Sequence, residues 1–151
     1  GKMFAEKFLS SRGLDGLVVV ALPRDTLNKL YNAADVLVVP SRQEGIGLVY
    51  YEALLAGTPV VGFHKSVEEL DRELGIYIGE GFNAAIEGSK ELAEKIKKVL
   101  NGSVDRHALR RAVTENLSWG VKFQEYDRIY RELAALTANT VGISRRGKQH
   151  G

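Results

Sequence analysis

Residues 40–53 of the chain read Pro40-Ser41-Arg42-Gln43-Glu44-Gly45-Ile46-Gly47-Leu48-Val49-Tyr50-Tyr51-Glu52-Ala53. They follow the apolar run Val36-Leu37-Val38-Val39, which is typical of a fully buried strand. Two glycines form a turn, and the mostly apolar segment 48–56 after it is typical of a buried helix. Gly57-Thr58-Pro59 ends that helix, and a second apolar run, residues 60–63, follows. The order strand, turn, helix, strand predicts a parallel crossover unit.

The turn in this unit is expected to lie where ligands bind. Open parallel sheets bind ligands beyond the carboxyl ends of their strands, which is where residues 41–47 belong. A helix that begins at Gly47 or Leu48 points free N–H groups into that space, and its dipole favours an anion there. Gly45 and Gly47 carry no side chain that would hold a phosphate away. Glycine turns also precede helices in proteins that bind nothing, so the residues alone leave both interpretations open.

Two glutamates add a second kind of contact. Glu44 lies in the turn, and Glu52 lies in a helix whose other residues are almost all apolar, where a carboxylate needs hydrogen-bond donors. Sugar or ribose hydroxyls are suitable donors. A glutamate near a helix start can also serve only to offset the helix dipole. A nucleotide diphosphate sugar would match the glycine turn and both carboxylates at once.

The whole run resembles the donor-binding half of the retaining glycosyltransferases of family four, also called group 1. The resemblance rests on a glutamate, seven intervening residues and a second glutamate, with glycines after the first, in the segments 32–41, 44–48, 52–53 and 56–61. It covers roughly residues 17–136. It implies an α/β fold with a Rossmann-like parallel sheet and helices on both faces, the donor half of the two-domain GT-B architecture.

The resemblance also implies an activity, which is retaining transfer of a sugar, of hexosyltransferase type, from a nucleotide diphosphate sugar to an acceptor hydroxyl. Glu44 would hold sugar hydroxyls as the catalytic-site carboxylate, and Glu52 would hold the ribose. Backbone amides would stabilise the departing diphosphate. By motif position the remaining substrate-binding residues are Ser41, Gly45, Ile46, Gly47 and Leu48, with Leu22, Pro23 and Arg24 beside the base. No nucleophile is assigned, and no metal or cofactor is expected besides the donor substrate.

The chain departs from the family pattern, because several parts of the family's enzymes are expected to be missing from it. The acceptor-binding domain and the first strand, helix and strand of the donor domain are expected to be missing, together with the cations that usually neutralise the diphosphate. The strand expected at residues 16–22 would then lack its usual neighbour. The chain is expected to be a fragment, to have a rearranged sheet, or to need a partner chain or a second copy, because an uncovered strand edge promotes association. The segment His64-Lys65-Ser66 replaces a glycine-rich run, which leaves the donor sugar open.

Composition limits the other classes of function. The chain has 151 residues. It contains no cysteine, which excludes disulfides and cysteine-ligated zinc. Its net charge of +2 is too small to drive binding to nucleic acid. Its three histidines are scattered and show no metal-ligand spacing. No transmembrane run and no signal peptide is visible, so we expect a cytoplasmic protein, with peripheral membrane contact through a basic tail as an alternative.

The remaining segments predict a donor domain at residues 1–137 and a basic, disordered tail at 138–151. An aromatic stripe in the last helix is expected to pack in a core or against another domain rather than to stack on bases.

Two other functions stay open: a non-catalytic module that binds a nucleotide sugar or a partner, and a general nucleotide-binding domain. The acceptor, whether sugar, polysaccharide or lipid, is not specified. Further expected elements are strand 76–79, a loop at 79–83, and helices 2–11, 26–33, 67–74, 89–100, 106–116 and one that begins at Trp119. Asp25, Ser89 and Asp105 are the expected N-caps of three of these helices.

Overall fold

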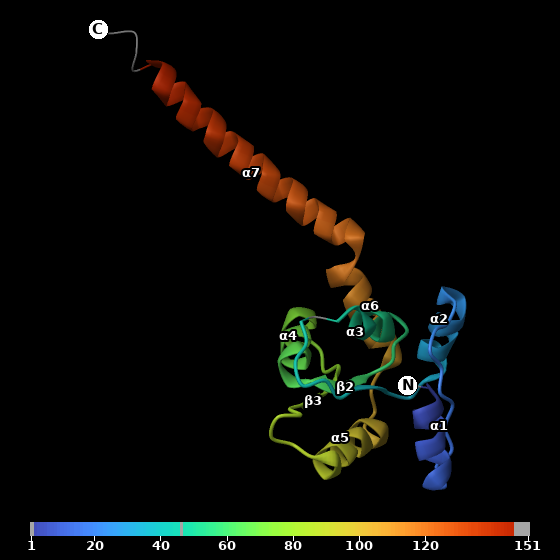
Figure 1. Cartoon of the computed structure of the whole chain (residues 1–151). Coiled ribbons are helices and arrows are strands. Elements are labelled where there is room, and N and C mark those ends of the chain that lie inside the picture. The colour runs from blue at the N-terminus through green and yellow to red at the C-terminus, as the bar shows by residue number, and fades with distance from the viewer. Residues whose placement is uncertain (1, 46, 147–151) are drawn as a thin grey trace.

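The structure, a computed structural model, describes residues 2–45 and 47–146 of the chain. Helices and strands alternate through its middle part, and helices alone form its two ends (Figure 1). In chain order the elements are α1 (Lys2–Ser11), α2 (Arg24–Ala33), β1 (Leu37–Val39), α3 (Leu48–Leu55), β2 (Val60–Phe63), α4 (His64–Leu74), β3 (Gly79–Phe82), α5 (Ser89–Asn101), α6 (Arg106–Leu117) and α7 (Trp119–Arg146).

The three strands form one parallel sheet in the order β1-β2-β3, in which Leu37 pairs with Val60 and Val60 pairs with Gly79. Helices α3, α4 and α6 lie on one side of this sheet and α5 lies on the other (Figure 1). The expected α/β class, with a parallel sheet and helices on both faces, is therefore confirmed. The crossover unit expected around residues 36–63 is β1-α3-β2.

Each face of the sheet has its own apolar cluster, because neighbouring strand residues point to opposite faces. Val60 packs on the side of α3, α4 and α6, where Tyr50, Leu54, Leu70, Ile78 and Leu109 are buried with it. Val61 packs on the side of α5, against Phe82 and Val99. Burial on both faces explains why the second apolar run has no polar residue in it.

The strand expected at residues 16–22 does not form, and this expectation was wrong. Residues 14–23 are neither helix nor strand, and the side chains of Leu17 and Val20 are 86% and 78% exposed. A strand is stable only when its backbone groups pair with a neighbouring strand. In the described part of the chain β2 is the only strand that pairs with β1, and none pairs with residues 16–22.

The third strand lies three residues later than expected, at Gly79–Phe82, where a loop was predicted. Gly79 has a φ of +151° and approaches the backbone of Val60 so closely that no side chain would fit. Glycine at this position therefore lets β3 pair with β2, and the sequence signal for a loop came from the same glycines.

Helix starts also differ in detail from the expectations. Pro23, not Asp25, is the N-cap residue of α2, and Gly88, not Ser89, is that of α5. Helix α4 begins at His64, directly after β2, rather than at Val67. The predicted cap at Asp105 is confirmed, because its side chain accepts hydrogen bonds from the N–H groups of His107 and Ala108.

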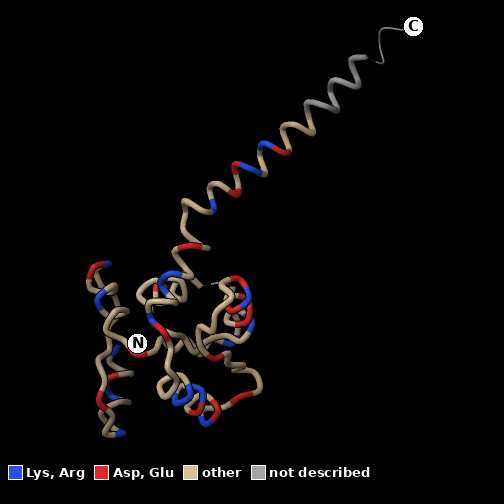
Figure 2. Tube along the Cα trace, turned by 180° about the vertical axis from the view of Figure 1, so that it is seen from behind, with Lys and Arg blue, Asp and Glu red and all other residues tan. Residues whose placement is uncertain are grey.

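Helix α7 projects away from the rest of the molecule (Figure 1). Its aromatic stripe is exposed, with Trp119 75% accessible, so the stripe is not packed in the core of this chain as expected. Two residues of the stripe, Trp119 and Tyr126, border a hollow that α3 and α6 also line. Lys and Arg alternate with Asp and Glu along this helix and along α5 (Figure 2). The helix continues to Arg146, so residues 138–146 of the expected tail are helical, whereas 147–151 lie outside the described residues. The division of the chain at residue 137 stays a prediction.

Candidate functional site

The loop between β1 and α3 lies at the edge of the sheet where ligands are expected. Because the strands are parallel, their carboxyl ends, Val39, Phe63 and Phe82, meet at the same edge. Helix α3 begins at Leu48 after the loop, and α4 begins at His64 without any loop. The loop residues and the first turn of α4 are therefore neighbours in space.

Glu44 has one occupied and one free carboxylate oxygen. The hydroxyl of Ser41 donates to Oε1 at 3.1 Å. The other oxygen, Oε2, is buried and accepts no hydrogen bond from residues 2–45 or 47–137. A side-chain carbon at Gly47 would lie 2.9 Å from Oε2, so this glycine leaves the carboxylate its space. Since buried acceptors nearly always have a donor, Oε2 is suited to accept a hydrogen bond from a ligand.

The first turn of α3 supplies the free amides that the sequence predicts. Its N-cap residue is Gly47, whose lack of a side chain leaves these N–H groups without a side-chain cap. Leu48 follows with an exposed side chain, and Gly45 is also exposed. Ile46, predicted to contribute an amide, lies outside the described residues. The helix start next to Glu44 is thus open to an anion.

Tyr50 connects this loop to the end of β2 and was not predicted as a site residue. Its hydroxyl accepts a hydrogen bond of 3.0 Å from the backbone N–H of Phe63. Burial raises the pKa of Tyr50, the bond from Phe63 opposes the rise, and the negative charge of Glu44 adds to it. A sequence signal did exist, because Gly62 interrupts an apolar strand where the ring of Tyr50 lies against the backbone.

The first turn of α4 completes the site. Ser66 is 3% exposed, and its hydroxyl donates to the backbone oxygen of Gly45 at 3.2 Å. His64 Nδ1 is buried and, like Glu44 Oε2, has no hydrogen-bond partner in the part of the chain whose side chains are described. Nothing in the local sequence pattern marks Ser66 as a loop contact, because its partner lies 21 residues earlier.

Glu52 lies apart from this group, on the side of α3 that faces α2. The structure places it on the surface, not in the apolar surroundings expected from its neighbours. The hydroxyl of Tyr31 donates to Glu52 Oε2 at 3.0 Å. Burial first, and then the hydrogen bond to Glu52, raise the pKa of Tyr31 to about 12. Glu52 thus contacts α2, and no hydrogen bond in the described chain connects it to Glu44.

The predicted base-contacting residues form the start of α2. Leu22 is half-buried, Pro23 is the N-cap residue of α2, and Arg24 is its first residue. Arg24 is exposed and forms no ion pair or side-chain hydrogen bond with any residue that the structure describes. No hydrogen bond among the described residues connects these three residues with the loop at 41–47. Their predicted contact with the base therefore stays a prediction.

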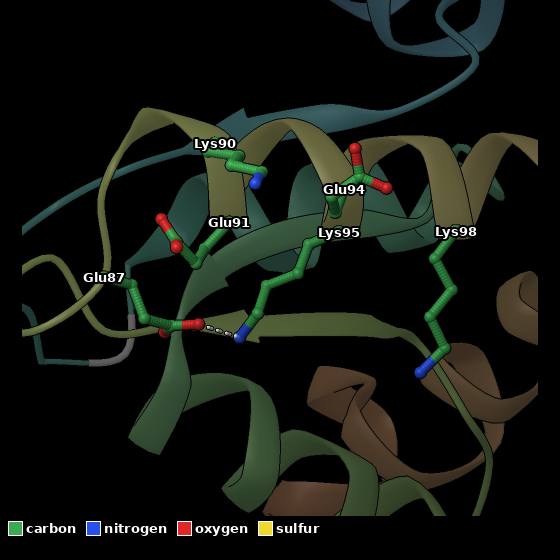
Figure 3. A pocket seen from close by; sticks show the side chains of 6 residues that line it. All are labelled: Glu87, Lys90, Glu91, Glu94, Lys95 and Lys98. Atoms are coloured by element: carbon green, nitrogen blue, oxygen red, sulfur yellow. Dashed lines mark ion pairs between the residues drawn. The ribbon is translucent and has the colours of Figure 1, made fainter.

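Neither Glu44 nor Glu52 lines the two hollows of the described surface, although Leu48, a predicted site residue, lines the second of them. One, of about 300 Å³, lies along α5 and is lined by Lys and Glu side chains. Figure 3 shows Lys95 reaching toward Glu87, at 2.7 Å; Lys98 pairs with Glu80 at 2.7 Å. The other, of about 610 Å³, lies between α3, α6 and α7 and is lined by Tyr51, Trp119 and Lys122 among others. The candidate site is instead the open edge of the sheet.

The described residues contain neither a candidate metal site nor a candidate membrane span. No three His, Asp or Glu side chains among them come together in a way that could hold a metal ion. None of their helices is both long and apolar enough to cross a membrane.

Comparison with known proteins identifies the family. Residues 2–102, which include the loop, both glutamates and α4, match the family described as Glycosyl transferases group 1. The chain belongs to this family. Within it, the chain is similar to a D-inositol 3-phosphate glycosyltransferase of Corynebacterium diphtheriae, with 29% identity over 120 residues, 76% of this chain and 27% of that protein.

Two further relatives match this group 1 family member over most of its length. A glycogen synthase of Bacillus cereus is 26% identical over 125 residues, 77% of this chain and 26% of that enzyme. Spore coat protein SA of Bacillus subtilis is 33% identical over 104 residues, 64% of this chain and 26% of that protein. The chain therefore spans about a quarter of the length of the curated relatives it matches.

Proposed function

We propose that this chain is the donor-binding part of a retaining glycosyltransferase and binds a nucleotide diphosphate sugar. The observation that carries the proposal is the free oxygen of Glu44, which lies beside the uncapped start of α3 at the carboxyl edge of the sheet. This arrangement offers an acceptor for sugar hydroxyls next to donors for phosphate oxygens. Membership of the group 1 family supports the same reading.

In the proposed reaction, of hexosyltransferase type, the bond between the anomeric carbon and the diphosphate oxygen breaks, and the diphosphate leaves with the electron pair. A bond from the acceptor oxygen to the same face of that carbon replaces it, and the proton of the acceptor hydroxyl passes to the departing diphosphate. Amides at the start of α3 would stabilise the leaving charge in a preorganised way. Glu44 would hold the sugar by its hydroxyls. Because these amides supply the stabilisation, the proposal includes no metal ion and no cofactor.

The proposed ribose contact is Glu52. Tyr31 occupies one of its oxygens, Oε2, while Oε1 accepts no hydrogen bond from the described residues and faces solvent with the rest of the exposed side chain. Ser41 supports the site by holding the first oxygen of Glu44. Leu22, Pro23 and Arg24 remain proposed neighbours of the base.

An acceptor-binding part is proposed to lie outside this chain, in a longer polypeptide or in a partner. The observation that favours it is coverage, since the chain matches only 27% and 26% of two relatives. The same observation favours the second candidate, a non-catalytic nucleotide-sugar-binding or partner-binding module. The proposed acceptor is a sugar, a polysaccharide or a lipid, and acceptor screening would test it. The proposed location is cytoplasmic, with peripheral membrane contact, and cell fractionation would test it.

Calorimetric titration of the full chain tests the proposed function. The probes are the diphosphates of uridine, guanosine and adenosine and their glucose or mannose adducts. We expect one series to bind and Glu52→Ala to abolish that binding. We expect Glu44→Ala to weaken binding of the nucleotide sugar but not binding of the bare diphosphate. Equal loss on both ligands for Glu44→Ala would favour a general nucleotide-binding domain. Release of the diphosphate on adding an acceptor would separate an enzyme from a binding module.

A further inference from the structure

We propose that His64 is a further ligand-binding residue of this site and contacts the sugar part of the nucleotide sugar through Nδ1. The proposal rests on the proposed function and deepens it. Glu44 Oε2 and His64 Nδ1 are the two buried side-chain atoms without a hydrogen-bond partner in the described part of the chain. The first already has a ligand role in the proposal, and the second has no role within the fold.

His64 lies at the same edge of the sheet as Glu44. It is the first residue of α4 and follows the last residue of β2. Two residues later, Ser66 donates to the backbone oxygen of Gly45, which places the first turn of α4 against the loop that carries Glu44. The N–H of Phe63, one residue before His64, is bonded to the hydroxyl of Tyr50, and Glu44 acts on that hydroxyl through its charge.

The imidazole of His64 packs against one neighbouring ring, and the backbone of His64 lies close to β3. The rings of Phe63 and His64 meet edge to face, with 4.8 Å between their centroids. On the neighbouring strand, a side-chain carbon at Gly81 would lie 2.9 Å from the Cα of His64 and 3.1 Å from its Cβ, so this glycine leaves room for the residue. A side chain packed in this way loses less conformational entropy when a ligand binds than an unpacked one.

The surroundings of His64 favour the sugar over the nucleoside. Glu52, the proposed ribose contact, is bonded to Tyr31 of α2, whereas the loop that carries Glu44 is bonded to Ser66 in the first turn of α4, which begins at His64. A carboxylate can only accept hydrogen bonds, but a neutral imidazole nitrogen accepts in one tautomer and donates in the other. Sugar hydroxyls both donate and accept, so a carboxylate and an imidazole together match them better than two carboxylates would.

A purely structural histidine would show a different pattern. Its buried nitrogen would be bonded within the fold, as is usual for buried polar atoms. One charged group near His64 is Glu87, whose pKa is lowered by Lys95 first, then by the N–H of Asn83, and least by His64. Glu87 is thus already paired with Lys95, at 2.7 Å (Figure 3), and is not hydrogen-bonded to the imidazole of His64.

Three variants of the full chain test the proposal. His64→Leu removes the polar atoms, His64→Asn keeps a polar atom near the position of Nδ1, and His64→Gln moves it toward that of Nε2. The probes are the same three diphosphates and their glucose or mannose adducts, measured by calorimetry. The melting temperature of each variant without ligand gives a second readout that does not depend on binding.

We expect His64→Leu to weaken binding of the nucleotide sugar about tenfold, which is the scale of one lost hydrogen bond. Binding of the bare diphosphate should weaken less than about twofold. We expect His64→Asn to retain more of the preference for the sugar adduct than His64→Gln. Because Nδ1 has no partner in the fold, His64→Leu should not lower the melting temperature. A lower melting temperature with unchanged sugar preference would show a structural role and overturn the proposal.

The outcomes separate this proposal from the proposed function. If the wild-type chain binds a nucleotide sugar and His64→Leu binds it equally well, only the role of His64 is overturned. If the wild-type chain binds none of the probes, the proposed function of the chain and the role of His64 are overturned together. Equal weakening of both ligands would also reject a sugar-specific contact.

Discussion

The hydroxyl of Tyr50 accepts a hydrogen bond of 3.0 Å from the backbone N–H of Phe63, and this bond ties α3 to the point where β2 becomes α4. Both partners are buried. The two helices carry the two sides of the candidate site, Glu44 before α3 and His64 at the start of α4. The geometry of the site therefore depends on a contact between a side chain and the backbone 13 residues away.

Tyr50→Phe removes this hydroxyl and leaves the N–H of Phe63 buried without a partner. We expect a loss of about 1–3 kcal/mol in the free energy of unfolding, measured by urea denaturation. Tyr51→Phe is the matched control, because the hydroxyl of Tyr51 has no hydrogen bond to any described residue and the side chain is half-buried. Equal losses for both variants would show that the bond to Phe63 is not what stabilises the end of β2.

Gly47 and Gly45 differ in what surrounds them, although they lie in the same loop. A methyl group at Gly47 would press on Glu44 Oε2, whereas one at Gly45 would meet nothing within 4 Å. Because a glutamate side chain can move, we expect Gly47→Ala to leave stability nearly unchanged and to weaken nucleotide-sugar binding. Gly45→Ala should leave stability unchanged and weaken binding less than Gly47→Ala does, because it leaves Glu44 in place. Calorimetry and thermal denaturation of the two variants check this, and stronger weakening by Gly45→Ala would contradict it.

Arg106 joins α6 to the segments that enter β1 and β2. Its guanidinium donates to the backbone oxygens of Ala34 and Asn32 and to the hydroxyl of Thr58, at 2.8, 3.0 and 3.0 Å. We expect Arg106→Ala to lower the free energy of unfolding by about 1–3 kcal/mol, since the part-buried acceptors at Ala34 and Thr58 would lose a charged donor. The control is Arg111→Ala, an exposed residue of the same helix. Similar effects of both variants would refute the role of Arg106.

Asp105 should make the stability of the chain depend on pH. The N–H of Ala108 first, and then that of His107, hold its pKa below the ordinary value. A carboxylate with a lowered pKa stabilises the fold above the ordinary pKa of aspartate, about 3.9, and this stabilisation is lost as the pH falls through the folded pKa. Asp105→Asn should therefore cost more near neutral pH than in acid. A melting-temperature difference that grows as the pH falls would contradict this.

The isolated chain is expected to self-associate or to bind a partner chain. On its side away from β2, β1 has no strand beside it in the described residues, and Leu17 and Val20 are exposed in the segment that forms no strand. Light scattering over a range of concentrations should show particles larger than the monomer. Leu17→Lys with Val20→Lys should reduce this association. A monomer at every micromolar concentration would speak against the expectation.

The amino-acid sequence by itself determined the unit β1-α3-β2 and the position of its loop. Continuous apolar runs, two glycines and a Gly-Thr-Pro helix end are local signals, and they act within a few residues of one another. The same holds for α1, for the cap at Asp105 and for the placement of Glu44 in the loop. The family motif adds the expected roles, but it is equally local.

Only the tertiary structure decided which apolar segments become strands and which polar atoms find partners. Residues 16–22 have the composition of a strand and form none, whereas the glycine-containing segment at 79–82 pairs with β2. Tyr50, Ser66 and His64 join the site through contacts with the loop and with β2 and β3. Strand pairing and burial depend on neighbours far away in the chain, and a local sequence pattern carries no information on whether those neighbours are there.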